Sequence, residues 1–281
     1  MAPGSTVPRR QLGRELRKLR TAADLKIEQV TSGFGWSRSK LFRIEKGEVP
    51  TSRTDVMAMC QLYGAADALA DTLIALADES KRRGWWHSHS DAIPEWFTLY
   101  VSLEATASRL RHYCSELVPD LLQTPEYARE VALAADTGTD VDAATRVRTE
   151  RQTLLTREDP PHLEVVVNEA VIRRPVGGPT VMADQLQHLL DAVEVRSATI
   201  RVLPFAAGVH AGMSCPYALL GFPGDDEDDV AYVQTPTSGA YVEKPAELAR
   251  YQTLFADATD RSLDQDRSRD LIAAAVKEFR S

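Results

Sequence analysis

Apolar residues repeat with helical spacing over the first eighty residues of the chain. Leu12, Leu16 and Leu19 are separated by four and then three positions, in a segment that is otherwise mostly charged. This stripe predicts an amphipathic helix from Arg9 to Ala23. Similar patterns predict four further helices, over residues 27–33, 37–46, 53–63 and 65–83. The first part of the chain is therefore expected to be an all-α domain of five helices.

A turn and a capping residue separate the second and third of these helices. Gly35 lies where the chain must change direction, and the hydroxyl group of Ser37 can cap the helix that follows. The third helix is expected to bury Leu41 and Ile44, three residues apart, and to end at Gly47. Two short helices joined in this way have the layout of a helix-turn-helix motif.

Beyond residue 83 the pattern changes. Residues 84–91 combine glycine, tryptophan and small polar side chains, and they mark a domain junction. Short β-branched runs then predict strands at 163–167, 199–203, 217–221, 230–233 and 240–242. Helices are expected at 96–114, 125–135, 182–195, 246–255 and 264–279. We predict a flexible N-terminal segment (1–8), an all-α domain (9–83), a linker (84–94) and an α+β domain (95–281).

The composition agrees with a globular, non-exported protein. The 281 residues are 43% hydrophobic and 26% charged, close to globular averages. The three cysteines have no CxxC spacing, which disfavours a zinc cluster or a disulfide framework. No run of about 18 apolar residues is present, so neither a transmembrane helix nor a signal peptide is predicted. We expect a cytoplasmic protein without membrane contact.

Charge is distributed unevenly along the chain. Residues 1–83 contain 15 basic and 10 acidic side chains, whereas the remaining 198 residues contain 18 and 31. The net charges are therefore +5 and −13, although the whole chain carries −8. A basic domain on an acidic body is expected when one domain alone binds a polyanion. A solvated basic helix face would give the same balance, so charge alone does not decide.

The third helix has the residue types that DNA recognition needs. A helix fits the major groove, where the side chains near its N-terminus reach base edges. Successive residues of a helix are rotated by about 100°, so the side chains that point away from the buried Leu41 and Ile44 can be identified. They are Ser39, Phe42, Arg43 and Lys46, with Arg38 at the edge of the same face.

Residues 12–47 also resemble a known family. The runs 16–20, 37–39 and 43–47 are similar to the Cro and phage-repressor type of helix-turn-helix, also called the xenobiotic-response-element family. The resemblance implies a lambda-repressor-like fold and base reading by Arg38, Ser39 and Arg43. It also makes Lys40 and Lys46 candidates for phosphate contacts. An Arg bound to both O6 and N7 of guanine contributes ~1–3 kcal/mol of discrimination.

The same resemblance implies an ion pair between Arg20 and Glu45, which ties the first helix to the end of the recognition helix. Two residues depart from the family pattern. Ile27 stands where a phosphate-contacting Gln is usual at the start of the second helix. Phe42 occupies an outward position that is commonly polar, where it can touch a thymine methyl or pack in a protein interface.

The second domain resembles the C-terminal domain of a large set of actinobacterial regulators. The similar segments are 103–105, 117–129, 202–208 and 243–245. This resemblance implies a developmental or antitoxin-like regulator that is paired with a small protein encoded nearby. Asp120, where glycine is usual, and Gln234, where glutamate is expected, depart from the pattern.

Catalytic and metal-binding patterns are weak. His87 and His89 lack the further ligands of a zinc site, and His112 and Cys114 would point apart on the predicted helix. No GxSxG, phosphate-binding loop or GxGxxG occurs. We therefore expect no enzyme activity, no metal and no cofactor.

Three other features have structural interpretations, each with a functional alternative. The acidic run 225–229 is expected to be a solvated connection rather than a calcium loop. Glu104 is expected to pair with Arg111, seven residues on, rather than to contact a ligand. Trp85, Trp86 and Trp96 either pack at the domain junction or line a small-molecule pocket.

These observations predict a sequence-specific regulator of transcription that binds double-stranded DNA as a homodimer and is nucleoid-associated when bound. The expected phosphate contacts are Arg9, Arg10, Arg14, Lys40 and Lys46. One alternative is an antitoxin-like interaction module whose acidic domain binds a small protein. Another is an effector-sensing regulator, which requires a closed apolar pocket in the second domain.

Overall fold

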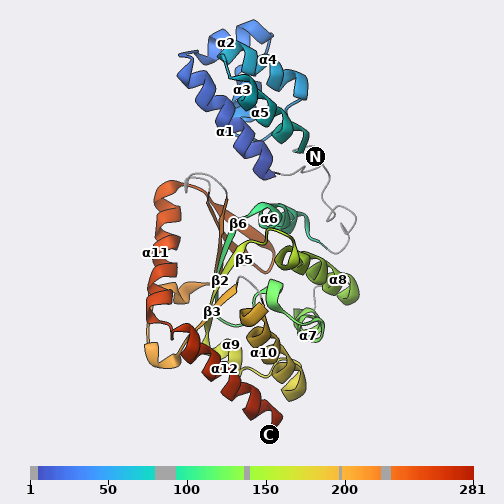
Figure 1. The fold of residues 1–281 in the computed structure, drawn as a ribbon, viewed down its shortest axis with the longest axis vertical. Coiled ribbons are helices and arrows are strands. Elements are labelled where there is room, and N and C mark those ends of the chain that lie inside the picture. Colours follow the sequence, from blue (N-terminus) through green and yellow to red (C-terminus); the bar gives the residue numbers. More distant parts are fainter. Residues whose placement is uncertain (1–5, 80–92, 136–139, 196–197, 223–228) are drawn as a thin grey trace. The chain divides into compact units, whose positions relative to one another are not determined.

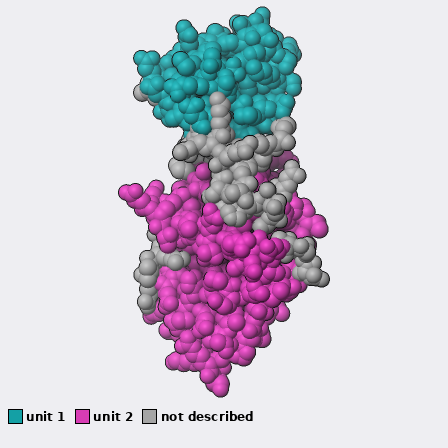
Figure 2. Space-filling view, turned by 90° about the vertical axis from the view of Figure 1, so that its right-hand side faces the viewer, with its two compact units in different colours: residues 1–88 teal, residues 89–281 magenta. Residues whose placement is uncertain are grey.

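The computed structural model describes residues 6–79, 93–135, 140–195, 198–222 and 229–281. The chain divides into two compact units, residues 1–88 and 89–281 (Figure 2). Among the described residues, no helix combines the length and apolarity needed to cross a lipid bilayer. The predicted junction 84–91, with His87, His89, Trp85 and Trp86, lies outside the described residues.

The first unit is all-α, as predicted. Its described helices are α1 (Thr6–Ala22), α2 (Ile27–Phe34), α3 (Arg38–Glu45), α4 (Arg53–Tyr63) and α5 (Asp67–Glu79) (Figure 1). The prediction of five helices is confirmed, and α4 has the predicted bounds. Helix α1 begins three residues earlier than predicted, because its leucine stripe does not extend over the first turn. Helix α5 begins two residues later.

Leucine side chains of α1 pack against α3 in the core of this unit. Leu12, Leu16, Leu41 and Ile44 are all buried and belong to one cluster, with further apolar residues of α2, α4 and α5. The glycine at position 13 lets the two helices approach closely. A Cβ atom there would lie 2.5 Å from the carbonyl oxygen of Ile44.

The second unit contains a six-stranded sheet with the order β3-β2-β1-β4-β5-β6. The strands are β1 (Arg109–Cys114), β2 (His162–Asn168), β3 (Ala198–Leu203), β4 (Tyr217–Gly221), β5 (Val230–Thr235) and β6 (Ser238–Val242). Strands β3, β2 and β1 are parallel, whereas β4, β5 and β6 continue the sheet in antiparallel pairs. Strand β1 is therefore the seam between a parallel half and an antiparallel half.

Helices cover both faces of this sheet. The helices of the unit are α6 (Glu95–Thr106), α7 (Pro125–Ala135), α8 (Val141–Gln152), α9 (Glu169–Arg173), α10 (Gly178–Val195), α11 (Pro245–Arg261) and α12 (Gln265–Arg280). Helix α11 lies on one side of the sheet, and α6, α7, α8 and α10 lie on the other (Figure 1). The core beneath α11 joins Tyr113, Leu219 and Ala231 of the sheet to Leu248 and Phe255 of the helix. The predicted α+β class is confirmed.

The structure corrects the prediction of one long helix over residues 96–114. Helix α6 ends at Thr106, and residues 109–114 form the central strand β1. Polar and apolar side chains alternate over Arg109, Leu110 and Arg111, which is the strand pattern. Tyr100, Leu103, Ala107 and Leu110 also have helical spacing, and this spacing concealed the change of period.

Helix α8 was not predicted, because it is rich in Arg and Thr and has little apolar periodicity. The five predicted strands are all present, each extended by no more than two residues at an end. Residues 225–228 of the acidic run lie outside the described residues, but Asp229 is only 2% exposed. The expectation of a solvated side chain is wrong there, because Arg109 and Arg111 each place Nη2 3.4 Å from the Asp229 carboxylate.

Replacing Gly13 by alanine is expected to destabilise the first unit by about 1–3 kcal/mol, because the added methyl group overlaps the backbone of α3. Native-state hydrogen exchange of the α1 and α3 amides would measure the loss. Gly33→Ala is the matched control, since nothing lies within 4 Å of its Cβ position. Unchanged exchange in Gly13→Ala would contradict the close helix packing.

Candidate nucleic-acid interface and a cavity in the second unit

Local capping positions the helix-turn-helix motif of the first unit. Gly35 ends α2 in the left-handed region at φ 63°, a conformation that favours glycine. The Ser37 hydroxyl then accepts a hydrogen bond of 3.1 Å from the backbone N–H of Lys40. The predicted turn and serine cap are confirmed, and α3 begins at Arg38.

The outward side of α3 has the predicted composition. Leu41 and Ile44 are 0% and 2% exposed. The exposed side chains on or beside this helix are Arg38, Ser39, Lys40, Phe42, Arg43 and Lys46. We call these six residues the basic face. The structure thus brings together all three predicted base-reading residues and two of the predicted phosphate contacts.

Carboxylates lie beside three cations of the basic face. Arg38 is 2.6 Å from Glu28, Lys40 is 3.7 Å from Asp55, and Arg43 is 3.9 Å from Glu48. All six side chains are at least about a third exposed, and exposed pairs contribute ~0–1 kcal/mol. These cations can therefore exchange their carboxylate partners for a phosphate or a base at little cost.

A buried ion pair holds α3 against α1. Arg20 donates to Glu45 through Nε at 2.6 Å and Nη2 at 3.0 Å, and its Nη1 donates to the Leu25 carbonyl at 2.8 Å. The hydrogen bonds to Glu45 raise the pKa of Arg20, so the guanidinium stays charged. The implied Arg20–Glu45 pair is present. Because it fixes the inner side of α3, the basic face is held in one orientation.

The structure changes the interpretation of two other residues in this unit. Arg9 is only 6% exposed, so a phosphate contact would require its side chain to move, and its role stays a prediction. Arg10 and Arg14 are half-buried. The pattern of charge along α1 does not show this, because Arg9 lies among other arginines. Ile27 is half-buried and packs against the core, which accounts for an apolar residue where the resemblance implies Gln.

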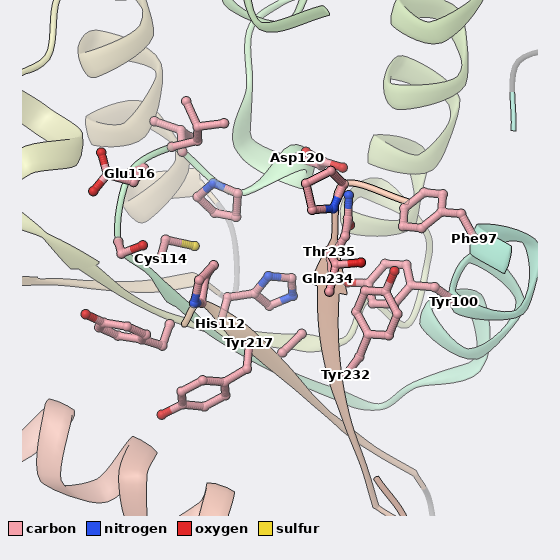
Figure 3. Close-up of a pocket in the computed structure, with 18 of the residues that line it drawn as sticks. Phe97, Tyr100, His112, Cys114, Glu116, Asp120, Tyr217, Tyr232, Gln234 and Thr235 are labelled. Carbon is pink, nitrogen blue, oxygen red and sulfur yellow. The ribbon is translucent and has the colours of Figure 1, made fainter. Parts of the chain in front are cut away.

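The second unit contains a cavity of about 470 Å³ on the sheet face opposite α11 (Figure 3). It lies at the carboxyl end of β1, between that strand, the 115–119 loop, α6, α8 and the ends of β4 and β5. Its buried lining includes Tyr100, His112, Arg151, Ala218 and Tyr232. Asp120 and Gln234, the two departures from the family pattern, also line it.

A charged cluster forms one wall of the cavity. Arg151 of α8 donates through Nε and Nη2 to the two Glu104 oxygens, both at 2.8 Å, and through Nη1 to Asp120 at 2.8 Å. The predicted partner of Glu104, Arg111, instead pairs with Asp229. That prediction assumed a helix through residue 111, whereas residue 111 lies on strand β1. Arg151 was missed because α8 was missed.

Side-chain amides fix the loop above this cluster. Gln123 Nε2 donates to the Val118 carbonyl at 2.7 Å, and Gln152 Nε2 donates to the Gln123 carbonyl at 2.6 Å. Gln185 accepts from the Thr124 N–H and donates to the Leu122 carbonyl, both at 2.7 Å. These side-chain amides therefore satisfy four backbone groups of the segment 118–124, which does not belong to the sheet.

The prediction that His112 and Cys114 point apart is wrong. On a strand, residues two apart share a face, and both side chains line the cavity (Figure 3). Burial raises the pKa of the Cys114 thiol to about 12 and lowers the pKa of His112. The thiol is therefore protonated at neutral pH, which makes it a poor nucleophile. Within the described parts of the chain, no three His, Cys, Asp or Glu residues are grouped to hold a metal.

Two families match the chain. Residues 11–73 match the family described as "Helix-turn-helix domain". Residues 97–274 match the family described as "Domain of unknown function (DUF5753)". Comparison with curated proteins and with solved structures found no match. The first match covers the motif that presents the basic face, and the second includes every residue that lines the cavity.

The Asp120 carboxylate makes a testable contribution to acid stability. Although burial alone would raise its pKa, Arg148 and Arg151 lower it from 3.8 to about 2. A lowered native pKa stabilises the fold above the unfolded value, and this contribution is lost as pH falls. Asp120→Asn should therefore be less stable than wild type at pH 6, with the difference shrinking between about pH 4 and 2.

Urea denaturation at several pH values measures this difference. Asp184→Asn is the control, because Asp184 belongs to an exposed pair, 3.7 Å from Arg280. A stability difference for Asp120→Asn that stays constant from pH 6 to pH 2 would contradict the assignment.

Proposed function

The chain belongs to the family defined by the domain of unknown function DUF5753, and it carries a helix-turn-helix domain; from these two facts we propose that it is a sequence-specific DNA-binding regulator of transcription. The observation that carries the proposal is the basic face of α3. Three positions of the helix are exposed for base contact, while Leu41, Ile44 and Glu45 hold its other side in the core.

Each exposed residue of the basic face has a proposed role in the major groove. Arg38, Ser39 and Arg43 read base edges, and Lys40 and Lys46 bind phosphates. Arg10 and Arg14 remain further phosphate candidates on α1. Phe42 is 49% exposed, and the Lys46 ammonium lies 4.5 Å from its ring centre. This contact favours a thymine-methyl role for Phe42 within the DNA interface, because the ring already lies beside a phosphate candidate.

We propose that the protein acts as a homodimer. A single recognition helix contacts only a few base pairs. Two helix-turn-helix domains on half-sites one DNA turn apart, ~34–36 Å, double the number of base pairs contacted. Dimers of helix-turn-helix proteins bind two half-sites in this way.

The second unit is proposed to regulate rather than to catalyse. Its cavity contains His112 and Cys114, but the protonated thiol makes nucleophilic catalysis unfavourable at neutral pH. The effector-sensing alternative requires a closed apolar pocket. The cavity of the second unit supports it in having a mostly apolar lining, although the cavity is partly open to solvent. Binding of a small partner protein is favoured only by the net charge of −13 beyond residue 83.

The proposal is tested by selecting bound duplexes from a random DNA library with the full-length protein at near-physiological salt. An enriched inverted repeat supports both sequence reading and the dimer. Binding without enrichment that disappears as salt rises would contradict sequence-specific recognition.

Two alanine variants separate base reading from phosphate binding. Arg43→Ala should relax the preference at one base position, with a loss of ~1–3 kcal/mol on the preferred duplex. Lys46→Ala should weaken all duplexes alike and reduce the salt slope by about one. Fluorescence anisotropy on the selected duplex and on single-base variants, over a range of salt, measures both effects.

Arg269→Ala and Lys277→Ala are the matched controls, because they remove the same charges from exposed positions of α12 in the second unit. If Arg43→Ala and Lys46→Ala bind every duplex as these controls do, α3 is not the recognition helix.

A further inference from the structure

The cavity of the second unit lies where α/β sheets commonly bind ligands. Strand β1 has a parallel neighbour, β2, on one side and an antiparallel neighbour, β4, on the other. The chain therefore leaves β1 and enters β4 at the same end of the sheet, and the two connecting segments diverge there. A crevice at the carboxyl end of such a strand is a recurrent binding site, and ~300–1,000 Å³ is the usual ligand-pocket volume. The volume of about 470 Å³ falls in this range.

The space in the cavity arises from one small residue in a row of larger ones. His112, Ala218, Tyr232 and Tyr241 are paired across β1, β4, β5 and β6, so they share one face of the sheet. Ala218 has only a methyl group between an imidazole and a phenol ring. Ala218 therefore forms part of the floor of the cavity, and a larger side chain at this position would fill it.

Aromatic rings line the side of the cavity near α6. The Tyr100 ring stacks on Phe97 at 5.1 Å between centroids and lies 4.4 Å from the Tyr232 ring (Figure 3). A Cβ atom at Gly239 would lie 2.5 Å from the Tyr232 ring, so glycine is required there to seat this ring. These stacked rings give a wall of π faces that complements a flat aromatic molecule.

The charged groups of the wall are already used within the protein. Arg151 is bound by Glu104 and Asp120, and its guanidinium lies 5.0 Å from the Phe97 ring centre. Asp120 also has Arg148 Nε at 3.5 Å. Two carboxylates thus balance two guanidinium groups, and a charged ligand would have to break one of these contacts. The wall favours an uncharged ligand.

Within the described residues, three lining side chains have a buried polar atom without a hydrogen-bond partner: His112 Nε2, Tyr217 Oη and Tyr232 Oη. His112 is 9% exposed, and its Nε2 atom is buried without a hydrogen bond within the described residues. Its imidazole lies among the lining side chains, between Cys114 and the Tyr100 and Tyr232 rings (Figure 3). Burial lowers the pKa of His112, so the ring is neutral at pH 7 and can make one hydrogen bond through Nε2. An unsatisfied buried atom of this kind destabilises the free protein and is satisfied when a ligand binds.

From these observations we propose that the cavity binds a neutral, planar aromatic small molecule, held between the Tyr100 and Tyr232 wall and Ala218 and hydrogen-bonded to His112 Nε2. The proposal rests on the effector-sensing role given above and names its ligand class, whereas it does not depend on DNA recognition by the first unit. Its test uses the full-length protein without DNA, so a failure of DNA recognition leaves the result unaffected.

Four naphthalene probes test the ligand class by calorimetric titration at pH 7. These are 2-naphthol, naphthalene, 2-naphthoate and 2-naphthylmethylammonium. We expect 2-naphthol to bind with a Kd of about 10–100 µM, the scale for a ligand of this size. Naphthalene lacks the hydroxyl group and should bind about tenfold more weakly, as expected for one lost hydrogen bond. The anion and the cation should each bind at least about tenfold more weakly than 2-naphthol.

Two variants assign the binding to this cavity. Ala218→Leu fills the floor and should weaken both neutral probes by about tenfold or more, whereas Ala240→Leu, at an exposed position of β6, should bind as wild type does. His112→Phe should remove the preference for 2-naphthol over naphthalene. It should also keep or raise the Tm, because it deletes an unsatisfied buried atom.

The combination of an unchanged or higher Tm with lost probe discrimination is specific to a binding residue, since a structural histidine would lower the Tm when replaced. The proposal is overturned if 2-naphthol and naphthalene both fail to bind at concentrations up to their solubility limits. It is also overturned if a charged probe binds best, or if Ala218→Leu and wild type bind 2-naphthol equally.

Discussion

Arg151 places a guanidinium group whose side chain is 3% exposed between Glu104 of α6 and Asp120 of the short helix η2 (Asp120–Leu122). Removing these charges from water is unfavourable, and the geometry compensates through two bonds to Glu104 and one to Asp120. The three residues are separated by up to 47 positions in the sequence. The arrangement of α6, the 118–124 loop and α8, and therefore the cavity beneath them, depends on this cluster.

The first unit uses the same kind of interaction for a different purpose. Arg20 and Glu45 are 25 positions apart, and their two hydrogen bonds connect α1 to the end of α3. Together with the close approach at Gly13, the pair fixes the inner side of α3. Replacing one partner of such a pair leaves an uncompensated charge and destabilises by about 3–5 kcal/mol when fully buried. In the first unit the Arg20–Glu45 pair orients the basic face. In the second unit the Glu104–Arg151 pair holds the elements around the cavity.

Much of the first unit was predictable from sequence because its determinants are local. The leucine stripe of α1, the Ser37 cap and the Gly35 turn each act within a few residues, and they placed the basic face correctly. Burial of Arg9 was not predictable, because it depends on helices that meet only in the folded unit. The resemblance supplied the Arg20–Glu45 pair, since spacing alone does not indicate which long-range pair forms.

The second unit was predicted less completely because its site is built from long-range contacts. The strands followed from β-branched runs, but β1 was hidden by helical spacing and α8 by its polar composition. Without β1, the shared face of His112 and Cys114 could not be recognised. Without α8, Glu104 had no partner other than Arg111. The resemblance did point to positions 120 and 234, and both line the cavity, although no sequence pattern connects them.

The cavity is connected to the helix-turn-helix unit along the chain, through helix α6. Helix α6 is the first helix described after residues 80–92, and its residues Phe97 and Tyr100 line the cavity. A ligand seated on these rings thus contacts the element that leads back along the chain to the first unit.

If occupancy of the cavity changes the affinity for DNA by some factor, DNA must change the affinity for the ligand by the same factor. Coupling of this kind requires that the ligand bind two arrangements of α6 unequally, because equal binding shifts no equilibrium. The Glu104–Arg151 contact ties α6 to α8, so any second arrangement of α6 must either move α8 with it or break a buried ion pair.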